Sequence, residues 1–324
     1  MREEIIPILK KLTDAVHKEG AAASIQIGHC GFFANKSVIG TTPIGPSRKF
    51  CLFRYSISRP MTEEDMNRVR EDFGNTAQMA IKAGFDAIEI HAGHGYLLSQ
   101  FLSPWTNSRN DQYGGSLENR LRFPASVVRH IREVVGPDFP ILIKMNLEDG
   151  FNGGLTLDES VEVAKRFEAE GASALVPSCG FTARTSFYMM RGQVPILEYA
   201  KSEKNLFTKL GLLMFGRIMV KEHPFKELFL FDQTKRIKDA VKIPVVYIGG
   251  VCSVDNMEAA MNEGFEFVQI GRATIRDPQV INKMQSGELT ASDCDHCNRC
   301  VAEMAATGVV CVADTRGFKY KEYK

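Results

Sequence analysis

The stretch that decides the fold is Ala87-Ile88-Glu89-Ile90-His91-Ala92-Gly93-His94-Gly95-Tyr96-Leu97-Leu98. A short apolar run with acidic interruptions, residues 85–90, predicts a strand buried in a sheet. Two histidines and a tyrosine follow it on a loop broken by glycine. Imidazole and phenol side chains at the carboxyl end of a strand are typical of the active site of an α/β barrel.

The spacing His91-x-x-His94-x-Tyr96 suits a particular kind of chemistry. Two imidazoles can donate hydrogen bonds to one oxygen atom, while a nearby phenol supplies a proton to the same substrate. Two other interpretations remain open at this point, because a pair of histidines can also bind a metal ion or simply form hydrogen bonds within the loop.

Short apolar strands alternate with amphipathic helices on both sides of this stretch, which predicts parallel pairing and right-handed crossovers. The expected strands are 22–27, 85–90, 139–145, 172–177, 244–248 and 265–270. The expected helices are 5–17, 63–83, 117–135, 157–170, 206–220 and 254–263, with Thr62, Thr156 and Ser253 as N-terminal caps.

The fold class is therefore α/β, a TIM (β/α)8-type barrel of which six of the eight strands are visible. The barrel is expected over residues 1–290, with an active-site insertion at 178–232 after the strand 172–177, which is the sixth barrel strand if two strands precede the first visible one. Residues 291–324 form a Cys-rich C-terminal segment. Two of the eight strands are not visible, so we expect exposed strand edges.

The composition narrows the function classes. The 324 residues include 40 basic and 39 acidic side chains, a net charge of +1, so no basic surplus is present to neutralise nucleic acid phosphates. No apolar run approaches the roughly 18 residues that a membrane span requires. The N-terminus lacks the pattern of a signal peptide, which predicts a cytoplasmic protein.

Two late strands end in glycine, at Gly249-Gly250 and at Gly271-Arg272. Glycine allows backbone N–H groups to approach a phosphate closely, and the arginine adds positive charge. Tight turns are the alternative interpretation of either pair. Two such strand ends in succession favour a phosphate-binding site, because the loops after the last two strands of a barrel commonly bind phosphate.

A longer segment directly after Leu98 carries a family resemblance. It reads Gln100-Phe101-Leu102-Ser103-Pro104-Trp105-Thr106-Asn107-Ser108-Arg109-Asn110-Asp111-Gln112-Tyr113-Gly114-Gly115-Ser116-Leu117-Glu118-Asn119-Arg120. This segment resembles the signature of the Old Yellow Enzyme family of FMN-dependent oxidoreductases, and the likeness continues to about Cys300.

The resemblance implies an FMN-dependent NAD(P)H oxidoreductase, with NADH or NADPH as reductant, that reduces the activated C=C bond of α,β-unsaturated carbonyl substrates. His91 and His94 would then bind the carbonyl oxygen, and Tyr96 would protonate the α-carbon. Gln26 would contact the flavin ring. Lys144 stands where the family often has arginine. A lysine keeps the positive charge but lacks the planar guanidinium group, which can donate two parallel hydrogen bonds.

The resemblance also implies that Gly249, Gly250, Gly271 and Arg272 hold the FMN phosphate. In the family pattern residues 22–27 correspond to the third strand, which places the first two strands before Met1, so we expect weak cofactor retention. Two alternatives to a flavin-dependent reductase remain open. One is a phosphate-binding barrel aldolase or lyase in which Lys144 forms a Schiff base. The other is an N-terminally truncated, inactive flavin-barrel fragment. Bound FMN separates the first alternative from the flavoenzyme, while the substrate and any homo-oligomer stay open.

Four cysteines gather near the C-terminus as Cys294-x2-Cys297-x2-Cys300-x10-Cys311. Thiolates at this spacing suit an iron–sulfur cluster or a structural zinc ion, and free thiols are the third interpretation. The pattern resembles the [4Fe–4S] site of the 2,4-dienoyl-CoA reductase branch of the family. It has one residue fewer than expected between the second and third cysteines.

Overall fold

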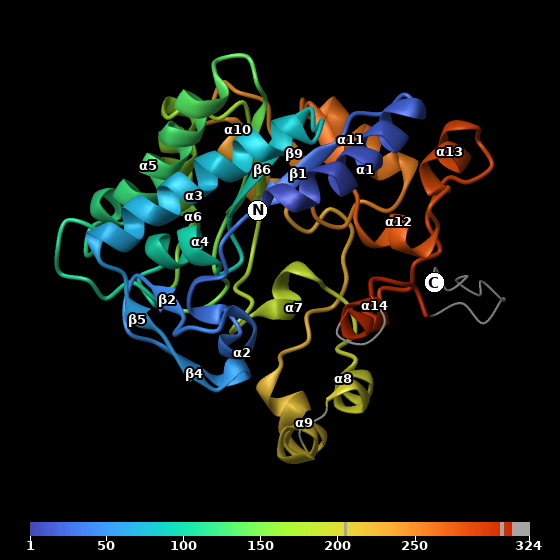
Figure 1. The fold of residues 1–324 in the computed structure, drawn as a ribbon. Coiled ribbons are helices and arrows are strands. Elements are labelled where there is room, and N and C mark those ends of the chain that lie inside the picture. Colours follow the sequence, from blue (N-terminus) through green and yellow to red (C-terminus); the bar gives the residue numbers. More distant parts are fainter. Residues whose placement is uncertain (204–205, 305–307, 313–324) are drawn as a thin grey trace. The chain divides into compact units, whose positions relative to one another are not determined.

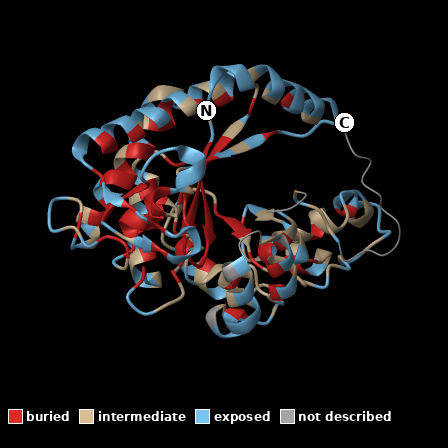
Figure 2. Ribbon diagram, turned by 60° about the horizontal axis from the view of Figure 1, so that its bottom comes forward, coloured by how far each residue is buried: buried red, intermediate tan, exposed pale blue. Residues whose placement is uncertain are grey.

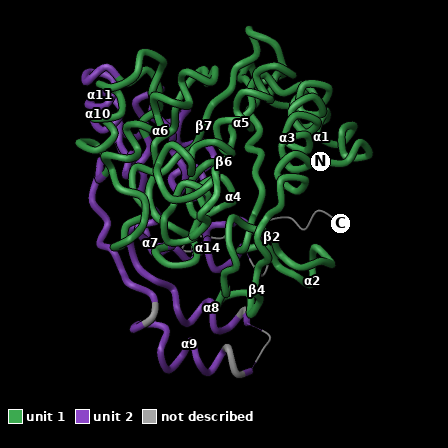
Figure 3. The backbone as a smooth tube through the Cα atoms, turned by 90° about the vertical axis from the view of Figure 1, so that its left-hand side faces the viewer, with its two compact units in different colours: residues 1–185, 230–247, 265–267 green, residues 186–229, 248–264, 268–324 purple. Residues whose placement is uncertain are grey.

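The computed structural model describes residues 1–203, 206–304 and 308–312, and the chain divides into two compact units (Figure 3). Unit 1 consists of Met1–Thr185, Leu230–Tyr247 and Phe265–Phe267. Unit 2 consists of Ser186–Phe229, Ile248–Gly264 and the chain from Val268 onwards. The central strands and the stretch from His91 to Tyr96 lie in unit 1.

A four-stranded parallel sheet in the order β1-β6-β7-β8 forms the centre of unit 1. Its strands are β1 (Ser24–Ile27), β6 (Ala87–Ala92), β7 (Ile141–Asn146) and β8 (Ala174–Ser178). Strands β6, β7 and β8 are almost entirely buried, as the red arrows of Figure 2 show. Burial on both faces explains why these strands read as near-continuous apolar runs.

The helices of unit 1 cover this sheet (Figure 1). They are α1 (Ile6–Lys18), α2 (Lys36–Ile39), α3 (Glu63–Lys82), α4 (Leu97–Leu102), α5 (Leu117–Val135), α6 (Leu157–Ala169) and α10 (Phe231–Lys238), with 3₁₀ turns at Glu3–Ile5, Gly31–Phe33 and Leu52–Arg54. The long helix α3 packs against α5. The expected bounds of α1, α3, α5 and α6 hold to within one residue, whereas α2, α4 and α10 were not expected from the sequence.

Thr62 and Thr156 are N-terminal caps as expected, and each is part of a capping box. At α3, Thr62 Oγ1 accepts a hydrogen bond from Asp65 N at 3.1 Å, and Asp65 Oδ2 accepts one from Thr62 N at 3.0 Å. Thr156 and Glu159 exchange the same pair of bonds at the start of α6. These reciprocal bonds satisfy backbone N–H groups that the first helical turn leaves without a partner.

The loop between β1 and α3 contains four strands of two residues each that the sequence did not predict. They are β2 (Ile44–Gly45), β3 (Phe50–Cys51), β4 (Ser56–Ile57) and β5 (Arg59–Pro60), paired as β2 with β5 and β3 with β4. A strand of two residues has no period that a sequence can display. The side chain of Cys51 is buried with Phe32 and Phe181, which anchors this loop to unit 1.

Unit 2 is largely helical. Its helices are α7 (Ser186–Met189), α8 (Ile196–Ser202), α9 (Leu206–Met219), α11 (Val254–Asn262), α12 (Arg272–Arg276), α13 (Val280–Gln285) and α14 (Arg299–Glu303). Helix α8 packs against α9 and α14. No helix in the described part of the chain is long and apolar enough to cross a membrane.

The last two predicted strands are β9 (Val246–Ile248) and β10 (Phe267–Gln269), which pair in a separate two-stranded sheet. A parallel bridge joins Leu175 of β8 to Val245 just before β9. All six predicted strands are therefore present, and the α/β barrel-type fold is confirmed. Among the described residues β1 pairs only with β6, so the strands do not close into a ring.

Candidate active site

Strand β6 and the turn after it position the two histidines and the tyrosine. His91 is the last residue but one of β6, His94 adopts a left-handed backbone with φ of 57°, and Tyr96 is the N-cap of α4. Gly95 also has a positive φ, of 77°, and a Cβ there would lie 2.4 Å from the ring of Phe181. Only glycine fits at that position, so the tight turn depends on it.

The three rings lie close together in unit 1. The centroid of the His91 ring is 4.7 Å from that of Tyr96 and 4.9 Å from that of His94. His94 N donates to Asn146 Oδ1 at 2.8 Å, which ties the turn to the end of β7. The three residues that the sequence grouped by spacing are thus grouped in space as well.

A directed chain of hydrogen bonds runs through the two imidazoles. Gly93 N donates to His91 Nδ1 at 3.3 Å, so the proton of a neutral His91 is on Nε2. His91 Nε2 is 3.2 Å from His94 Nδ1, and His94 Nε2 is 2.7 Å from Ser178 Oγ. The network assigns the Nε2–H tautomer to both rings, with Ser178 as the last acceptor.

Burial decides the protonation of these groups. It lowers the pKa of His91 to about 4, and the nearby charge of Lys144 adds to the effect. Burial also lowers the pKa of His94 well below the usual value, whereas it raises the pKa of the Tyr96 phenol. At neutral pH the site therefore has two uncharged imidazoles and a phenol that keeps its proton.

A buried carboxylate connects the two residues expected to contact the flavin ring. Gln26 Nε2 donates to Glu89 Oε1 at 2.5 Å, and Lys144 Nζ is 3.1 Å from the same oxygen. The parallel register places Gln26 beside Glu89 and Lys144 beside His91. Gln26 and Lys144 thus belong to one cluster with the histidines, and Lys144 forms an ion pair inside that cluster.

Three functional candidates were missed from the sequence: Glu89, Asn146 and Ser178. Asn146 Nδ2 donates to Asp149 Oδ1 and to Gly180 O, both at 2.8 Å, while its oxygen holds His94. All three are buried polar residues within or at the end of an apolar strand. That signal was available, because a buried polar residue in a strand needs a specific partner.

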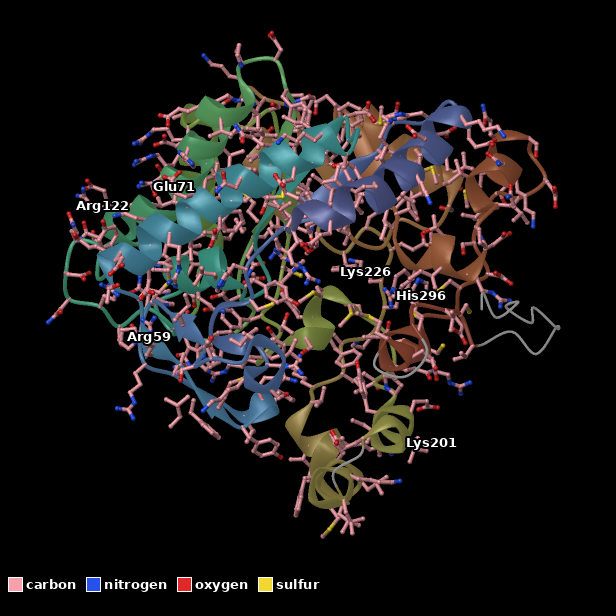
Figure 4. The ribbon with its side chains drawn as sticks, in the orientation of Figure 1. Arg59, Glu71, Arg122, Lys201, Lys226 and His296 are labelled. Atoms are coloured by element: carbon pink, nitrogen blue, oxygen red, sulfur yellow. The ribbon has the colours of Figure 1, made fainter. Side chains whose placement is uncertain are left out.

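The four residues expected to bind the FMN phosphate belong to unit 2. A Cβ at Gly250 would lie 2.6 Å from the carbonyl oxygen of Lys226, a residue labelled in Figure 4, so close backbone approach requires this glycine. Arg272 Nη1 donates to Arg191 O at 2.7 Å and to Asn298 Oδ1 at 2.6 Å. Phosphate binding by Gly249, Gly250, Gly271 and Arg272 stays a prediction.

The four clustered cysteines line a small cavity in unit 2 together with Arg272 and Asn298; they are Cys294, Cys297, Cys300 and Cys311. His296, labelled in Figure 4, stacks on Phe225 with ring centroids 3.4 Å apart. In the described part of the chain, no three Cys, His, Asp or Glu side chains are arranged to hold a metal ion. A [4Fe–4S] cluster at these thiols stays a prediction.

Comparison with known proteins identifies the family. The sequence profile of the NADH:flavin oxidoreductase / NADH oxidase family matches residues 1–179. A profile of the dihydrouridine synthase family matches residues 212–317, which is less than half of the chain. The chain is 39% identical over 313 residues to a 4,4'-dithiodibutanoate disulfide reductase of Rhodococcus erythropolis, covering 96% of this chain and 77% of that protein.

Solved structures agree with this assignment. The fold matches a 2-naphthoyl-CoA reductase in complex with 2-naphthoyl-CoA at a TM-score of 0.76 and 28% identity, over 92% of this chain and 43% of that one. An Old Yellow Enzyme homologue from Zymomonas mobilis matches at a TM-score of 0.67 and 21% identity, over 89% of this chain and 74% of that one, which shows the fold alone. The chain thus spans less than half the length of the first of these structures. The chain belongs to the NADH:flavin oxidoreductase / NADH oxidase family, the FMN-dependent oxidoreductases that its sequence resembles.

Proposed function

We propose that this NAD(P)H-dependent flavoenzyme reduces the activated C=C bond of α,β-unsaturated carbonyl compounds. The observation that carries the proposal is the cluster of His91, His94 and Tyr96, two neutral imidazoles and a protonated phenol within ring contact of one another. Such a cluster can polarise a carbonyl group by hydrogen bonds and deliver a proton at the same site.

FMN fits the residues beside this cluster. Lys144 brings a positive charge and Gln26 brings a side-chain amide, and both are tied to the buried Glu89. A flavin ring requires amide hydrogen bonds along its pyrimidine edge and a positive charge where negative charge develops on reduction. When bound, FMN supplies the hydride. Gln26 and Lys144 would hold its ring.

The residues of the chain perform the rest of the reaction. The substrate carbonyl oxygen would take over the Nε2–H donors of His91 and His94, which in the structure face His94 Nδ1 and Ser178 Oγ. These hydrogen bonds draw electron density from the C=C bond. Because burial keeps both imidazoles neutral, they donate hydrogen bonds without releasing a proton to the oxygen. Tyr96 supplies the proton to the α-carbon, and burial keeps that proton on the phenol until the substrate takes it.

The test is steady-state turnover without oxygen. Purified holoenzyme receives NADH or NADPH and 2-cyclohexenone, and the products are identified by mass spectrometry. We expect one cyclohexanone for each NAD(P)H oxidised. Oxidation of NAD(P)H by FMN with no reduced ketone would refute alkene reduction while leaving the family assignment intact.

Disulfide reduction is a second candidate, favoured by the 39% identity to a 4,4'-dithiodibutanoate disulfide reductase. One NAD(P)H and one proton convert a disulfide R–S–S–R into two thiols, so the same hydride donor and the same acid are required. The assay above, repeated with a disulfide and a thiol reagent, separates the two candidates. Release of two thiols for each NAD(P)H, without reduction of the enone, would establish the second.

A further inference from the structure

A cavity of about 870 Å³ in unit 1 opens beside Tyr96. It lies between the loop after β1, the turn Leu52–Arg54, and helix α3. Three arginines line it, Arg54, Arg59 and Arg68, whereas Asp72 is the one carboxylate among the lining residues. Arginines therefore outnumber carboxylates among the residues that line the cavity.

Two of these arginines form ion pairs with a carboxylate of the protein. Arg59 donates to both oxygens of Asp65, at 2.5 and 2.9 Å, and Arg68 Nη2 is 2.9 Å from Asp65 Oδ1. Arg59 is labelled in Figure 4, close to the first turn of α3. Asp65 thus balances one of the two charges and fixes both side chains.

Arg54 differs from its neighbours. Its guanidinium lies over the ring of Phe33, with Cζ 4.7 Å from the ring centroid, and the residue is exposed. No salt bridge joins it to any carboxylate in the described part of the chain. Stacking on an aromatic ring orients a guanidinium and leaves its donor edge available to a ligand.

Phe33 is also the link to the reacting groups. Its ring centroid is 6.5 Å from that of Tyr96, in an edge-to-face arrangement, so one aromatic ring separates Arg54 from the proton donor. The positive charge of Arg54 is close enough to act on the Tyr96 phenol. A ligand that reaches Tyr96 through this cavity passes within the range of Arg54.

We propose that Arg54 binds a carboxylate of the substrate, and that the enzyme acts on compounds carrying an acidic group a few atoms from the reacting bond. The guanidinium can accept a carboxylate through two parallel N–H···O bonds, which fixes both position and orientation. This inference rests on the proposed function, because the enone as the group that is reduced comes from there. The anion site itself depends only on the cavity.

Binding to the oxidised holoenzyme tests the site without turnover. Isothermal titration calorimetry compares 6-oxohept-4-enoate, whose carboxylate is separated from the C=C bond by two methylene groups, with its methyl ester, which has the same enone and no charge. In the Arg54→Gln variant we expect the Kd of the acid to rise roughly ten- to a hundredfold, as for loss of a hydrogen bond to a charged group, with the Kd of the ester unchanged. Arg54→Lys should lose part of the acid's affinity.

The matched control is Arg48→Gln, an exposed arginine of the same loop that does not line the cavity, and it should bind both ligands as the wild type does. Equal binding of acid and ester by the wild type, or an unchanged Kd of the acid in Arg54→Gln, would overturn the proposal. The proposal would also be overturned if Arg54→Gln weakened the binding of NAD(P)H alone. If the acid binds in a way that depends on Arg54 but is not reduced by the enzyme, the proposed reaction is refuted and the anion site stands.

Discussion

At the scale of single residues, the site combines groups whose protonation is set by burial. His91 and His94 are hydrogen-bonded in series, and the charge of Lys144 helps to keep both uncharged. Tyr96 keeps its proton because its phenol is partly withdrawn from water. The site can therefore hold a carbonyl oxygen and supply a proton at the same pH.

Replacing Tyr96 with Phe should affect one half-reaction only. Substrate reduction should slow by about 10²–10⁴-fold, because the general acid is lost. Reduction of the flavin by NAD(P)H should continue at its normal rate. Stopped-flow absorbance resolves the two steps, and equal slowing of both would contradict the proton-donor role.

Replacing Ser178 with Ala removes the last acceptor of the histidine chain, 2.7 Å from His94 Nε2. We expect the tautomer of His94 to become mixed, and the KM for the carbonyl substrate to rise by roughly tenfold, the usual effect of losing one hydrogen bond. Nitrogen NMR of the imidazoles reports the tautomer directly. Ser178→Thr keeps the hydroxyl and should restore both properties, whereas an unaltered spectrum in Ser178→Ala would exclude a positioning role.

The pH dependence of stability follows from His91. Its pKa is about 4 in the folded chain and about 6.5 when unfolded, so between these values the unfolded state binds more protons. The free energy of unfolding should therefore fall as the pH drops from 6.5 to 4, by up to about 3 kcal/mol from this residue. Urea unfolding of the wild type and of His91→Gln measures it, and parallel pH profiles for the two proteins would refute the assignment.

At the scale of elements, the carboxyl ends of parallel strands bring the site together. β6 carries His91, β7 ends in Asn146 and β8 ends in Ser178. Each strand is buried on both faces, so the register is strongly specified and the polar ends meet at one edge. The cluster thus follows from the order β1-β6-β7-β8.

The capping box at α3 gives a prediction about stability. Thr62→Ala removes the acceptor of the Asp65 amide and should lower the free energy of unfolding by about 1 kcal/mol. Thr62→Ser keeps the hydroxyl and serves as the control. Chemical denaturation monitored by circular dichroism gives both values. A loss of the same size in the serine variant would show that the methyl group, and not the cap, is responsible.

Much of the fold was predictable, because periodicity and caps mark long elements. Residues 117–135 form α5 as expected, and the six strands appear with shifts of up to two residues at their ends. The strands β2 to β5 were not predictable from the sequence, because their pairing is decided by contacts such as those of the buried Cys51. The sequence also grouped His91, His94 and Tyr96, but it could not show that Glu89 joins Gln26 to Lys144 across strands.

At the scale of the whole molecule, family membership predicts a bound flavin. Purified protein should be yellow and should release FMN, not FAD, on denaturation. Replacing Lys144 with Met should weaken FMN retention, because the positive charge beside Glu89 and Gln26 is lost. Chromatography of the released flavin with its absorbance spectrum measures both. A protein that stays colourless with added FMN would contradict the assignment.

The central claim is that reduced flavin and Tyr96 together saturate the substrate. The most direct measurement is a single turnover without oxygen, in which FMN in the holoenzyme is first reduced by light with EDTA as the electron donor and the enone is then added. We expect the flavin absorbance to return and one saturated ketone to form for each flavin. A flavin that stays reduced in the presence of the enone, but is reoxidised when oxygen is admitted, would show that the reduced flavin does not transfer hydride to the enone.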